Sequence, residues 1–256
     1  MKIASWNVNS LRVRLAHVLD WLGAAKPDVL ALQETKTKDP DFPVEAFADA
    51  GYQVAFAGQP TYNGVALIAR EPIESTIHDL DDFKDEQRRV LGATIAGVRV
   101  LNLYVPNGQS VDSEKYQYKL NWLSALYAHL EQELKSYDRC VVLGDFNIAP
   151  EDRDVHDPEQ WRDKVLCSEP EREALNRILS LGFVDTFRMF EDADNVFSWW
   201  DYRAAAFRRN LGLRIDLILA SNALAGACTA ASIDVEPRRL ERPSDHTPVV
   251  AEFDVR

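Results

Sequence analysis

Short apolar runs bounded by polar residues recur from one end of the chain to the other. Most are five to eight residues long, are rich in Leu or β-branched residues, and end in Asn, Asp, Glu or Gly. Such runs predict β-strands that deliver polar side chains to the edge of a sheet. They read KIASWN, DVLALQE, YQVAFA, GVALIAR, RVLGATI, VRVLNLYV, CVVLGDFN, LRIDLILAS and TPVVAEFD.

Three segments between these runs carry apolar residues at helical spacing instead. We expect helices over 11–22, 113–136 and 170–182, the last of which opens with Pro and closes with Gly, as helices prefer. YNG at 62–64 and AGVR at 96–99 predict tight hairpin turns. Hairpins mixed with crossover helices favour a layered α/β protein with mixed sheets. Because the runs extend from residue 2 to residue 254, we expect a single domain over 1–256.

Composition narrows the class of protein. The 256 residues are 46% hydrophobic and 27% charged, which allows a full core and argues against disorder. No apolar run approaches the ~20 residues of a membrane span, and the start lacks the features of a signal peptide. Cys140, Cys167 and Cys228 are widely spaced, which argues against a disulfide framework or a cysteine zinc site. We therefore expect a cytoplasmic protein, monomeric and without a membrane partner.

The charge distribution leaves a phosphate-rich partner open. A net charge of −12 counts against nucleic acid when taken alone, because phosphate binding uses Lys and Arg. The arginines are clustered, however, in pairs and groups near residues 88–89, 203–214 and 238–242. A binding face needs only local positive charge, although each cluster could equally be a solvated face.

Polar side chains at the predicted strand ends suggest a metal site. Asp145 and Asn147 are two residues apart and therefore lie on the same side of an extended chain. Asp216 stands in an apolar run, where a carboxylate is costly unless it is paired, and His246 beside Asp245 is an available partner. Each side chain alone could be a turn former or a surface acid. Together they favour Mg²⁺ or Mn²⁺, since hard oxygen ligands prefer these ions to zinc.

The order of the motifs resembles that of the exonuclease III family. The matching series, from residue 2 to about 254, is NVNSLR, LQETK, YNGVALIAR, QRRV, YVPNG, GDFNIAP, FSWWDYR, GLRIDLILAS and RPSDHTPV. The resemblance implies a four-layer αββα sandwich of the DNase I-like type and a Mg²⁺-dependent DNA-repair nuclease, with Mn²⁺ able to substitute. Asn9 stands where some relatives have an acid.

The resemblance also implies roles for individual residues. Asp145, held by Asn147, is the candidate for proton transfer, either activating water or protonating the leaving oxygen. His246, oriented by Asp216, would face the phosphate as an imidazolium. The implied catalytic residues are Tyr104, Asp145, Asn147, Asp216 and His246. The implied ligands of one or two metal ions are Asn7, Glu34, Asp145, Asn147, Asp245 and His246.

A separate segment, FSWWDYRAAAFRRNLGLRID, indicates the substrate. Aromatic residues interleaved with arginines suit a distorted DNA duplex, because rings can fill a gap in the base stack while arginines hold phosphates. We expect Trp199 in the core, phosphate contacts from the arginines of 203–214, and part of the rim of the site from 149–172. The predicted DNA contacts are Arg88, Arg89, Trp200, Tyr202, Phe207, Arg208 and Arg209.

The implied substrates are duplexes with abasic sites or 3′ lesions. The activities implied by the family are cleavage 5′ to an abasic site, removal of 3′ blocking groups and 3′-to-5′ digestion, in an open balance. Inositol-polyphosphate phosphatases, sphingomyelinases and secreted nucleases share the catalytic set, and a binding module without catalysis is a second class of alternative. The aromatic–arginine segment favours DNA, and the complete set of costly polar groups argues against a module that has lost catalysis.

Overall fold

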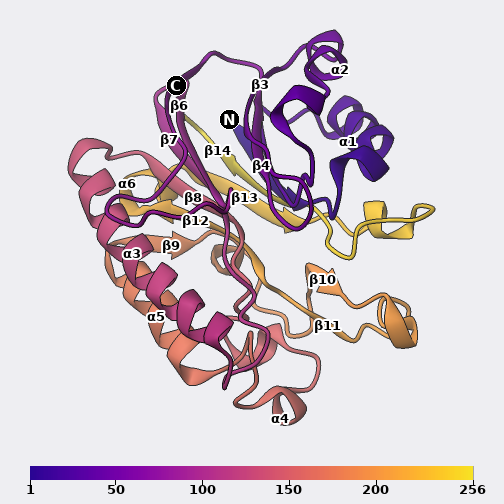
Figure 1. The fold of residues 1–256 in the computed structure, drawn as a ribbon, viewed down its shortest axis with the longest axis vertical. Coiled ribbons are helices and arrows are strands. Elements are labelled where there is room, and N and C mark those ends of the chain that lie inside the picture. The colour runs from indigo at the N-terminus through magenta and orange to yellow at the C-terminus, as the bar shows by residue number, and fades with distance from the viewer. Residues whose placement is uncertain (256) are drawn as a thin grey trace.

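Two six-stranded sheets pack face to face in the computed structural model, which describes residues 1–255 (Figure 1). The first sheet has the order β13 (Cys228–Ile233), β14 (Val249–Phe253), β1 (Lys2–Asn7), β2 (Val29–Gln33), β4 (Val65–Ala69), β3 (Gln53–Ala57). The second has the order β5 (Ile73–Ile77), β6 (Val90–Ile95), β7 (Val98–Tyr104), β8 (Cys140–Asp145), β12 (Asp216–Ser221), β9 (Phe183–Asp185). Both are mixed, because β1 with β2 and β7 with β8 are parallel pairs among antiparallel ones.

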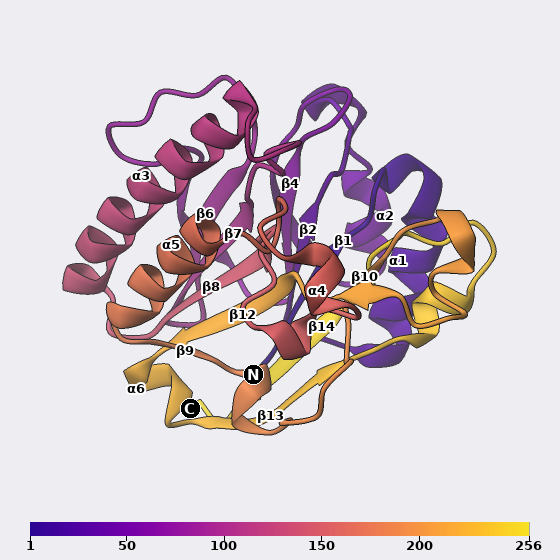
Figure 2. The same cartoon turned by 90° about the horizontal axis from the view of Figure 1, so that it is seen from below.

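Helices cover the outer face of each sheet, so the molecule has four layers (Figure 2). On one side lie α1 (Leu11–Ala25) and α2 (Val44–Asp49), and on the other α3 (Glu114–Ser136) and α5 (Glu169–Ser180). The serine that caps α3, Ser113, accepts a hydrogen bond from the backbone of Tyr116, and Ser168 and Glu171 form a capping box at the start of α5. The remaining helices are α4 (Pro158–Trp161) and α6 (Asn222–Ala225), with short 3₁₀ turns at Asp39–Asp41, Asp152–Asp154, Phe187–Met189, Arg203–Ala205 and Glu236–Arg239. This arrangement confirms the αββα prediction.

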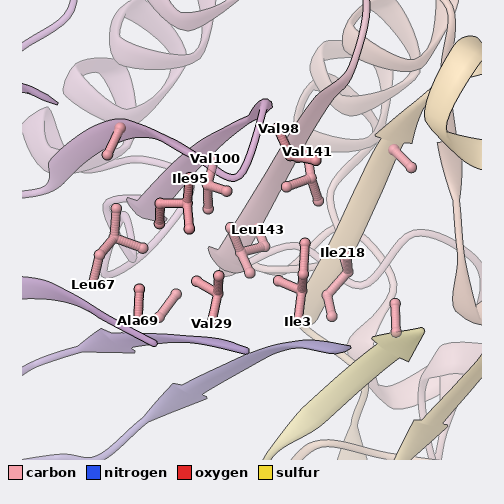
Figure 3. Close-up of a cluster of buried hydrophobic side chains, with 14 of the residues drawn as sticks. Ile3, Val29, Leu67, Ala69, Ile95, Val98, Val100, Val141, Leu143 and Ile218 are labelled. Atoms are coloured by element: carbon pink, nitrogen blue, oxygen red, sulfur yellow. The ribbon is translucent and has the colours of Figure 1, made fainter. Parts of the chain in front are cut away.

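Alternate residues of each central strand fill different layers. Ile3, Val29 and Leu67 of the first sheet face the second sheet, which contributes Val100, Leu143 and Ile218 to the same buried cluster (Figure 3). Their neighbours in the chain point outward, as Leu30 does toward the cluster of α1 and Val142 toward that of α3. Since both faces are buried, these strands read as continuous apolar runs. We propose from this shared core that the chain forms one domain.

The nine apolar runs each contain a strand, but several elements carried no such signal. The edge strands β5 and β13 are largely exposed, so their sequences IESTI and CTAASI lack a continuous apolar run. A small ribbon of β10 (Trp199–Trp200) and β11 (Gly212–Leu213) was also not predicted. Ala96 and Gly97 form the expected tight turn between β6 and β7. The prediction for YNG is wrong, because residues 62–64 end a longer loop over 58–64 between β3 and β4.

No helix within residues 1–255 is both long enough and apolar enough to cross a membrane.

Candidate active site

The predicted polar strand ends meet at one edge of the two sheets. Tyr104 lies beside Asp145 in the ladder of β7 and β8, and Asp145 lies beside Asp216 in that of β8 and β12. Because β12 runs antiparallel to β8, its first residue lies at the same edge as the last residue of β8. In the facing sheet, β1 ends at Asn7 and β2 ends one residue before Glu34. The edge therefore collects side chains from both sheets.

Gly144 brings β8 unusually close to β7 just before the site. Its φ is +144°, and a Cβ added there would lie 1.9 Å from the carbonyl oxygen of Leu103. Only glycine tolerates this approach. The glycine of the GDFN motif therefore sets the position from which Asp145 enters the site.

Asn7 holds two carboxylates side by side. Its Nδ2 donates to Glu34 Oε1 at 2.8 Å and to Asp145 Oδ2 at 2.9 Å, while its Oδ1 accepts from the backbone of Asn9 at 3.0 Å. Glu34 has a left-handed backbone, with φ of +50°. Non-glycine residues in this region are strained and concentrate at functional sites. In this arrangement Asn7 orients the acids, and its amide oxygen is already used.

His246 lies between two aspartates. Its Nδ1 is 2.9 Å from Asp216 Oδ2, and its Nε2 is 3.7 Å from Asp145 Oδ2. Asp216 also accepts from the hydroxyl of Ser198 at 2.6 Å, and all these side chains are buried. The ring is thus fixed by Asp216 with its second nitrogen toward Asp145.

Burial and charge shift the proton affinities of these groups. Burial raises the pKa of Asp145 to about 7; Asp216 and Glu34 add to the rise, and His246 opposes it. Burial works against a charged His246, but the nearby carboxylates of Asp216 and Asp145 outweigh it and raise the pKa of His246 to about 10. A cationic imidazole therefore stands beside a carboxyl group that can gain or lose a proton near neutral pH.

Tyr104 and Asn147 complete this side of the site. Burial, followed by the charges of Glu34 and Asp145, raises the pKa of Tyr104 well above its ordinary value, so its hydroxyl remains a hydrogen-bond donor. The backbone of Asn147 donates to Asp145 Oδ1 at 2.9 Å. The side chain of Asn147 accepts from Asn107 Nδ2 at 3.0 Å and donates to the carbonyl of Val105 at 3.0 Å. Asn147 is thus held on both sides of its amide.

Asp245 is linked to Asn7 through Asn9. It accepts from Asn9 Nδ2 at 2.9 Å and from the indole of Trp199 at 3.0 Å. Lys36 reaches the same region, with its Nζ 2.6 Å from Asn9 Oδ1 and 2.9 Å from Glu34 Oε2.

The donor set fits a hard divalent cation. Ligand atoms of Glu34, Asp145 and His246 lie within 4.8 Å of one another, and this is the grouping of at least three potential metal ligands found among the described residues. The carboxylate oxygens already face positive or donor groups, namely Lys36 Nζ and Asn7 Nδ2. The two adjacent carboxylates provide the negative charge and the oxygen ligands that such an ion needs.

The two tryptophans of FSWW exchange the positions expected of them. Trp200 is 2% exposed, packs against Phe197 and Phe207, and donates to Asn210. Trp199 is only half-buried and reaches Asp245 at the site. The expectation that Trp199 is the core residue is therefore wrong. In this structure Trp200 supports the loop from within, and its ring is not offered to DNA.

The residues predicted to contact DNA also differ in their exposure to solvent. Arg208 and Arg209 are exposed on the loop between β10 and β11, and Tyr202, 51% exposed, contacts Asn9 beside the site. Phe207 is half-buried against Trp200. Arg214 is 1% exposed, with its Nε 2.7 Å from Asp154 Oδ1 and its Nη1 2.8 Å from Asp185. Counting Arg214 among the phosphate-binding arginines was therefore wrong, because it braces the rim from inside.

A groove of about 700 Å³ opens next to Tyr104. Arg89 lines it, stacks on the Tyr104 ring at 4.7 Å and donates to the Tyr104 carbonyl at 3.1 Å. Tyr62, 73% exposed, and Lys115 lie along the same groove. Arg88 is half-buried, and its guanidinium lies 3.9 Å from Asp79 outside the residues that line the groove.

Several residues of the site were not expected from the sequence. Ser198 orients Asp216, Lys36 pairs with Glu34, and Lys119 contacts the backbone of Asn147 from below. Ser198 lies within the FSWWDYR motif, and this position was the one feature of the sequence that could have indicated its role. Lys119 looks like any polar position of an amphipathic helix.

Comparisons with known proteins agree with this geometry. The model of the Endonuclease/Exonuclease/phosphatase family matches residues 4–246. Exodeoxyribonuclease III of Haemophilus influenzae is 36% identical over 99% of this chain and 100% of its own length, and an exodeoxyribonuclease of Bacillus subtilis is 33% identical over 97% and 98%. Among solved structures, the 3′-5′ exonuclease NExo of Neisseria meningitidis superposes with a TM-score of 0.98 at 46% identity, and an AP endonuclease of Archaeoglobus fulgidus with 0.97 at 44%, each covering both chains fully. The chain belongs to the endonuclease/exonuclease/phosphatase family and, within it, to the exonuclease III family of nucleases.

Proposed function

We propose that this protein is a Mg²⁺-dependent DNA-repair phosphodiesterase that acts on duplex DNA with abasic sites or 3′ lesions. The observation that carries the proposal is the cluster of Glu34, Asp145 and His246, which joins a cation site to a proton-transfer pair. It lies beside a loop that exposes Tyr202, Arg208 and Arg209. A Neisseria 3′ phosphatase bound to a product DNA hairpin, 46% identical with a TM-score of 0.98, supports a DNA substrate.

The residues divide the work of phosphodiester hydrolysis. Glu34 and Asp145, with Asp245 nearby, would hold Mg²⁺, and Mn²⁺ would substitute. When bound, the ion supplies Lewis-acid stabilisation of the charge that builds up on the phosphate. Tyr104 and His246 would each donate to a phosphate oxygen, since the phenol stays neutral and the imidazole stays cationic. Asp145 would move the proton, taking it from the attacking water or giving it to the leaving oxygen.

The substrate would bind across both sides of the site. On one side lies the groove lined by Tyr62, Arg89 and Lys115. On the other, Tyr202, Arg208 and Arg209 present an aromatic and cationic loop. These surfaces suit a duplex whose backbone passes over the catalytic cluster, with positive charge concentrated locally although the net charge is −12.

Three labelled duplexes test the proposal and separate the activities. One carries a single internal abasic analogue, one a 3′ phosphate and one an intact recessed 3′ end, each incubated with Mg²⁺, with Mn²⁺ or with EDTA. The exonuclease and the AP endonuclease named above are about equally similar to this chain, so the assay must decide the balance. We expect cleavage of the abasic duplex and removal of the 3′ phosphate with either metal ion, and neither reaction with EDTA. Turnover of an inositol polyphosphate or sphingomyelin without turnover of any duplex would overturn the proposal.

A further inference from the structure

Lys119 is a completely buried lysine beneath the active site. It lies in the second turn of α3, and its Nζ donates to the carbonyl of Asn147 at 2.6 Å, to the carbonyl of Asn107 at 3.2 Å and to the carboxylate of Glu171. Lysine is almost never fully buried unless it is paired, because desolvating the ammonium group is costly. The three acceptors satisfy all three donors of the ammonium group.

Glu171 is equally buried and ties the pair to the rim of the site. Besides Lys119, it accepts from the backbone of Leu166 at 3.1 Å, from the backbone of Ser168 at 3.1 Å and from the Ser168 hydroxyl at 2.5 Å. The segment before α5 is therefore anchored to the same carboxylate that anchors Lys119. Glu171 takes one donor of the Lys119 ammonium group, and the other two are directed at the carbonyls of Asn107 and Asn147.

The two carbonyls that Lys119 contacts belong to Asn107 and to Asn147, whose side-chain amide lies in the proposed catalytic site. Asn107 donates its side chain to the side chain of Asn147 at 3.0 Å, and the backbone of Asn147 donates to Asp145 at 2.9 Å. Asn147 has a left-handed backbone, with φ of +50°, a region that Asn enters more readily than most L-residues. Lys119 therefore donates to the main-chain carbonyls of both Asn107 and Asn147, the two residues whose side-chain amides are hydrogen-bonded to each other.

The loop that carries Asn107 also rests on the lysine stem. Gly108 has a φ of +95°, and a Cβ added there would lie 3.3 Å from Lys119 Cδ and 3.1 Å from Val165 Cγ2. The loop, the lysine and the rim segment are therefore closely packed, and a methyl group at Gly108 would fit only if the Val165 or Lys119 side chain shifted.

We propose that Lys119 and Glu171 are positioning residues that fix Asn107 and Asn147, and through Asn147 the catalytic Asp145, in their working geometry. The inference rests on the proposed function for its kinetic consequence, but the contacts exist without substrate. Removal of Lys119 would free two carbonyls and let the Asn107–Asn147 bond open. Misplacement of a catalytic group by a small distance lowers turnover far more than it lowers substrate binding.

Four variants separate positioning from general stability. Lys119→Met keeps the apolar stem and removes the charge; Lys119→Met with Glu171→Gln removes both charges, so that no buried charge is left unpaired. Arg99→Met is the matched control, because Arg99 is a buried cation that pairs with Glu133 near the other end of the same helix, at 2.5 Å. Glu171→Gln alone tests the carboxylate.

The readouts are kcat and KM on the abasic duplex, the urea midpoint, and hydrogen exchange of the Asn147 side-chain amide by NMR. We expect Lys119→Met and the double variant to lose about 10- to 100-fold in kcat with KM changed less than about threefold. The double variant should regain stability without regaining kcat, while Arg99→Met loses stability and keeps kcat. The Asn147 amide should exchange faster in every variant that alters Lys119 or Glu171.

Opposite results would overturn the proposal. Wild-type kcat in the double variant, an equal loss of kcat in Arg99→Met, or unchanged exchange of the Asn147 amide would each show that the pair is only a structural staple. If the wild-type protein does not cleave DNA, the proposed function fails, and the exchange measurement still decides whether Lys119 and Glu171 hold Asn147.

Discussion

His246 and Asp216 form a closed, buried pair: the imidazole Nδ1 lies 2.9 Å from Oδ2 and 3.1 Å from Oδ1 of the aspartate. Oδ2 of the carboxylate also accepts a hydrogen bond from the hydroxyl of Ser198, at 2.6 Å. This contact fixes the ring and favours its charged form, so the two residues should act on the substrate as one group.

The first prediction concerns this pair. His246→Asn and Asp216→Asn should each lower kcat by about 10²- to 10⁴-fold on an abasic duplex in Mg²⁺, as expected for loss of a positioned proton donor. The double variant should be little worse than the more damaged single variant, because groups that act as a unit are not additive. The measurement is kcat for the three variants. If the two losses multiply in the double variant, the residues work independently.

Residues of this pair could be predicted because each stands out locally. Asp216 interrupts an apolar run, and a buried carboxylate is costly unless it is paired with a cation. His246, which follows an acid in a turn, was an available partner. The same argument applies to Asp145, at the end of a strand that is buried along its whole length. The central strands could be predicted because burial of both faces makes their sequences continuous apolar runs, whereas the exposed edge strands β5 and β13 have no such run.

The direction in which individual side chains point could not be predicted from the sequence pattern. Trp199 and Trp200 are neighbours in a strand and must point to opposite faces, but the pattern alone did not tell which face is the site. Arg214 resembled the exposed Arg208 in sequence, and only the fold brings Asp154 from a distant loop to bury it. Lys119 sits in an amphipathic helix at a position that looks solvated until the Asn147 loop is placed above it.

The second prediction concerns the metal. Glu34→Ala should lower single-turnover cleavage by more than ~100-fold at saturating DNA, because it removes a ligand for an ion worth several kcal/mol of charge stabilisation. The fold should survive, since Glu34 is not part of the core. Mn²⁺ binding followed by electron paramagnetic resonance, together with the Mg²⁺ dependence of cleavage, gives the test. The exposed Glu45 of α2, changed to Ala, is the control and should alter neither quantity. Full activity of Glu34→Ala in Mg²⁺ would remove Glu34 from the metal site.

The third prediction concerns the loop between β10 and β11. Changing both Arg208 and Arg209 to Ala should weaken binding of an abasic duplex and reduce the slope of log K against log salt by about 1.8, since each phosphate contact contributes about 0.9. Fluorescence anisotropy between about 50 and 200 mM salt measures the slope. Arg177→Ala serves as the control, because this exposed arginine of α5 stacks on Tyr127 away from the site. An unchanged slope in the double variant would make the loop a solvated face.

The last prediction concerns the brace behind the rim. Asp154 is fully buried and accepts from Arg214 and from Arg188, the latter at 2.5 Å. Burial alone would raise the pKa of Asp154, but the two arginines outweigh it and lower the pKa below its ordinary value. Asp154→Asn leaves Arg188 without an anion and leaves Arg214 with Asp185 as its remaining carboxylate, and it should lower the free energy of unfolding at neutral pH by about 3–5 kcal/mol.

The pH dependence of that loss follows from the lowered pKa of Asp154. A carboxyl group with a lower pKa in the folded than in the unfolded chain stabilises the fold above the unfolded value of about 3.9. The stabilisation disappears as the pH falls through the lower folded value, where wild-type Asp154 becomes neutral like the asparagine. Urea unfolding of both proteins from about pH 7 down to about pH 2 should therefore show a constant difference that shrinks only below about pH 4. A difference that stays constant over the whole range would mean that Asp154 stabilises the rim by its shape and not by its charge.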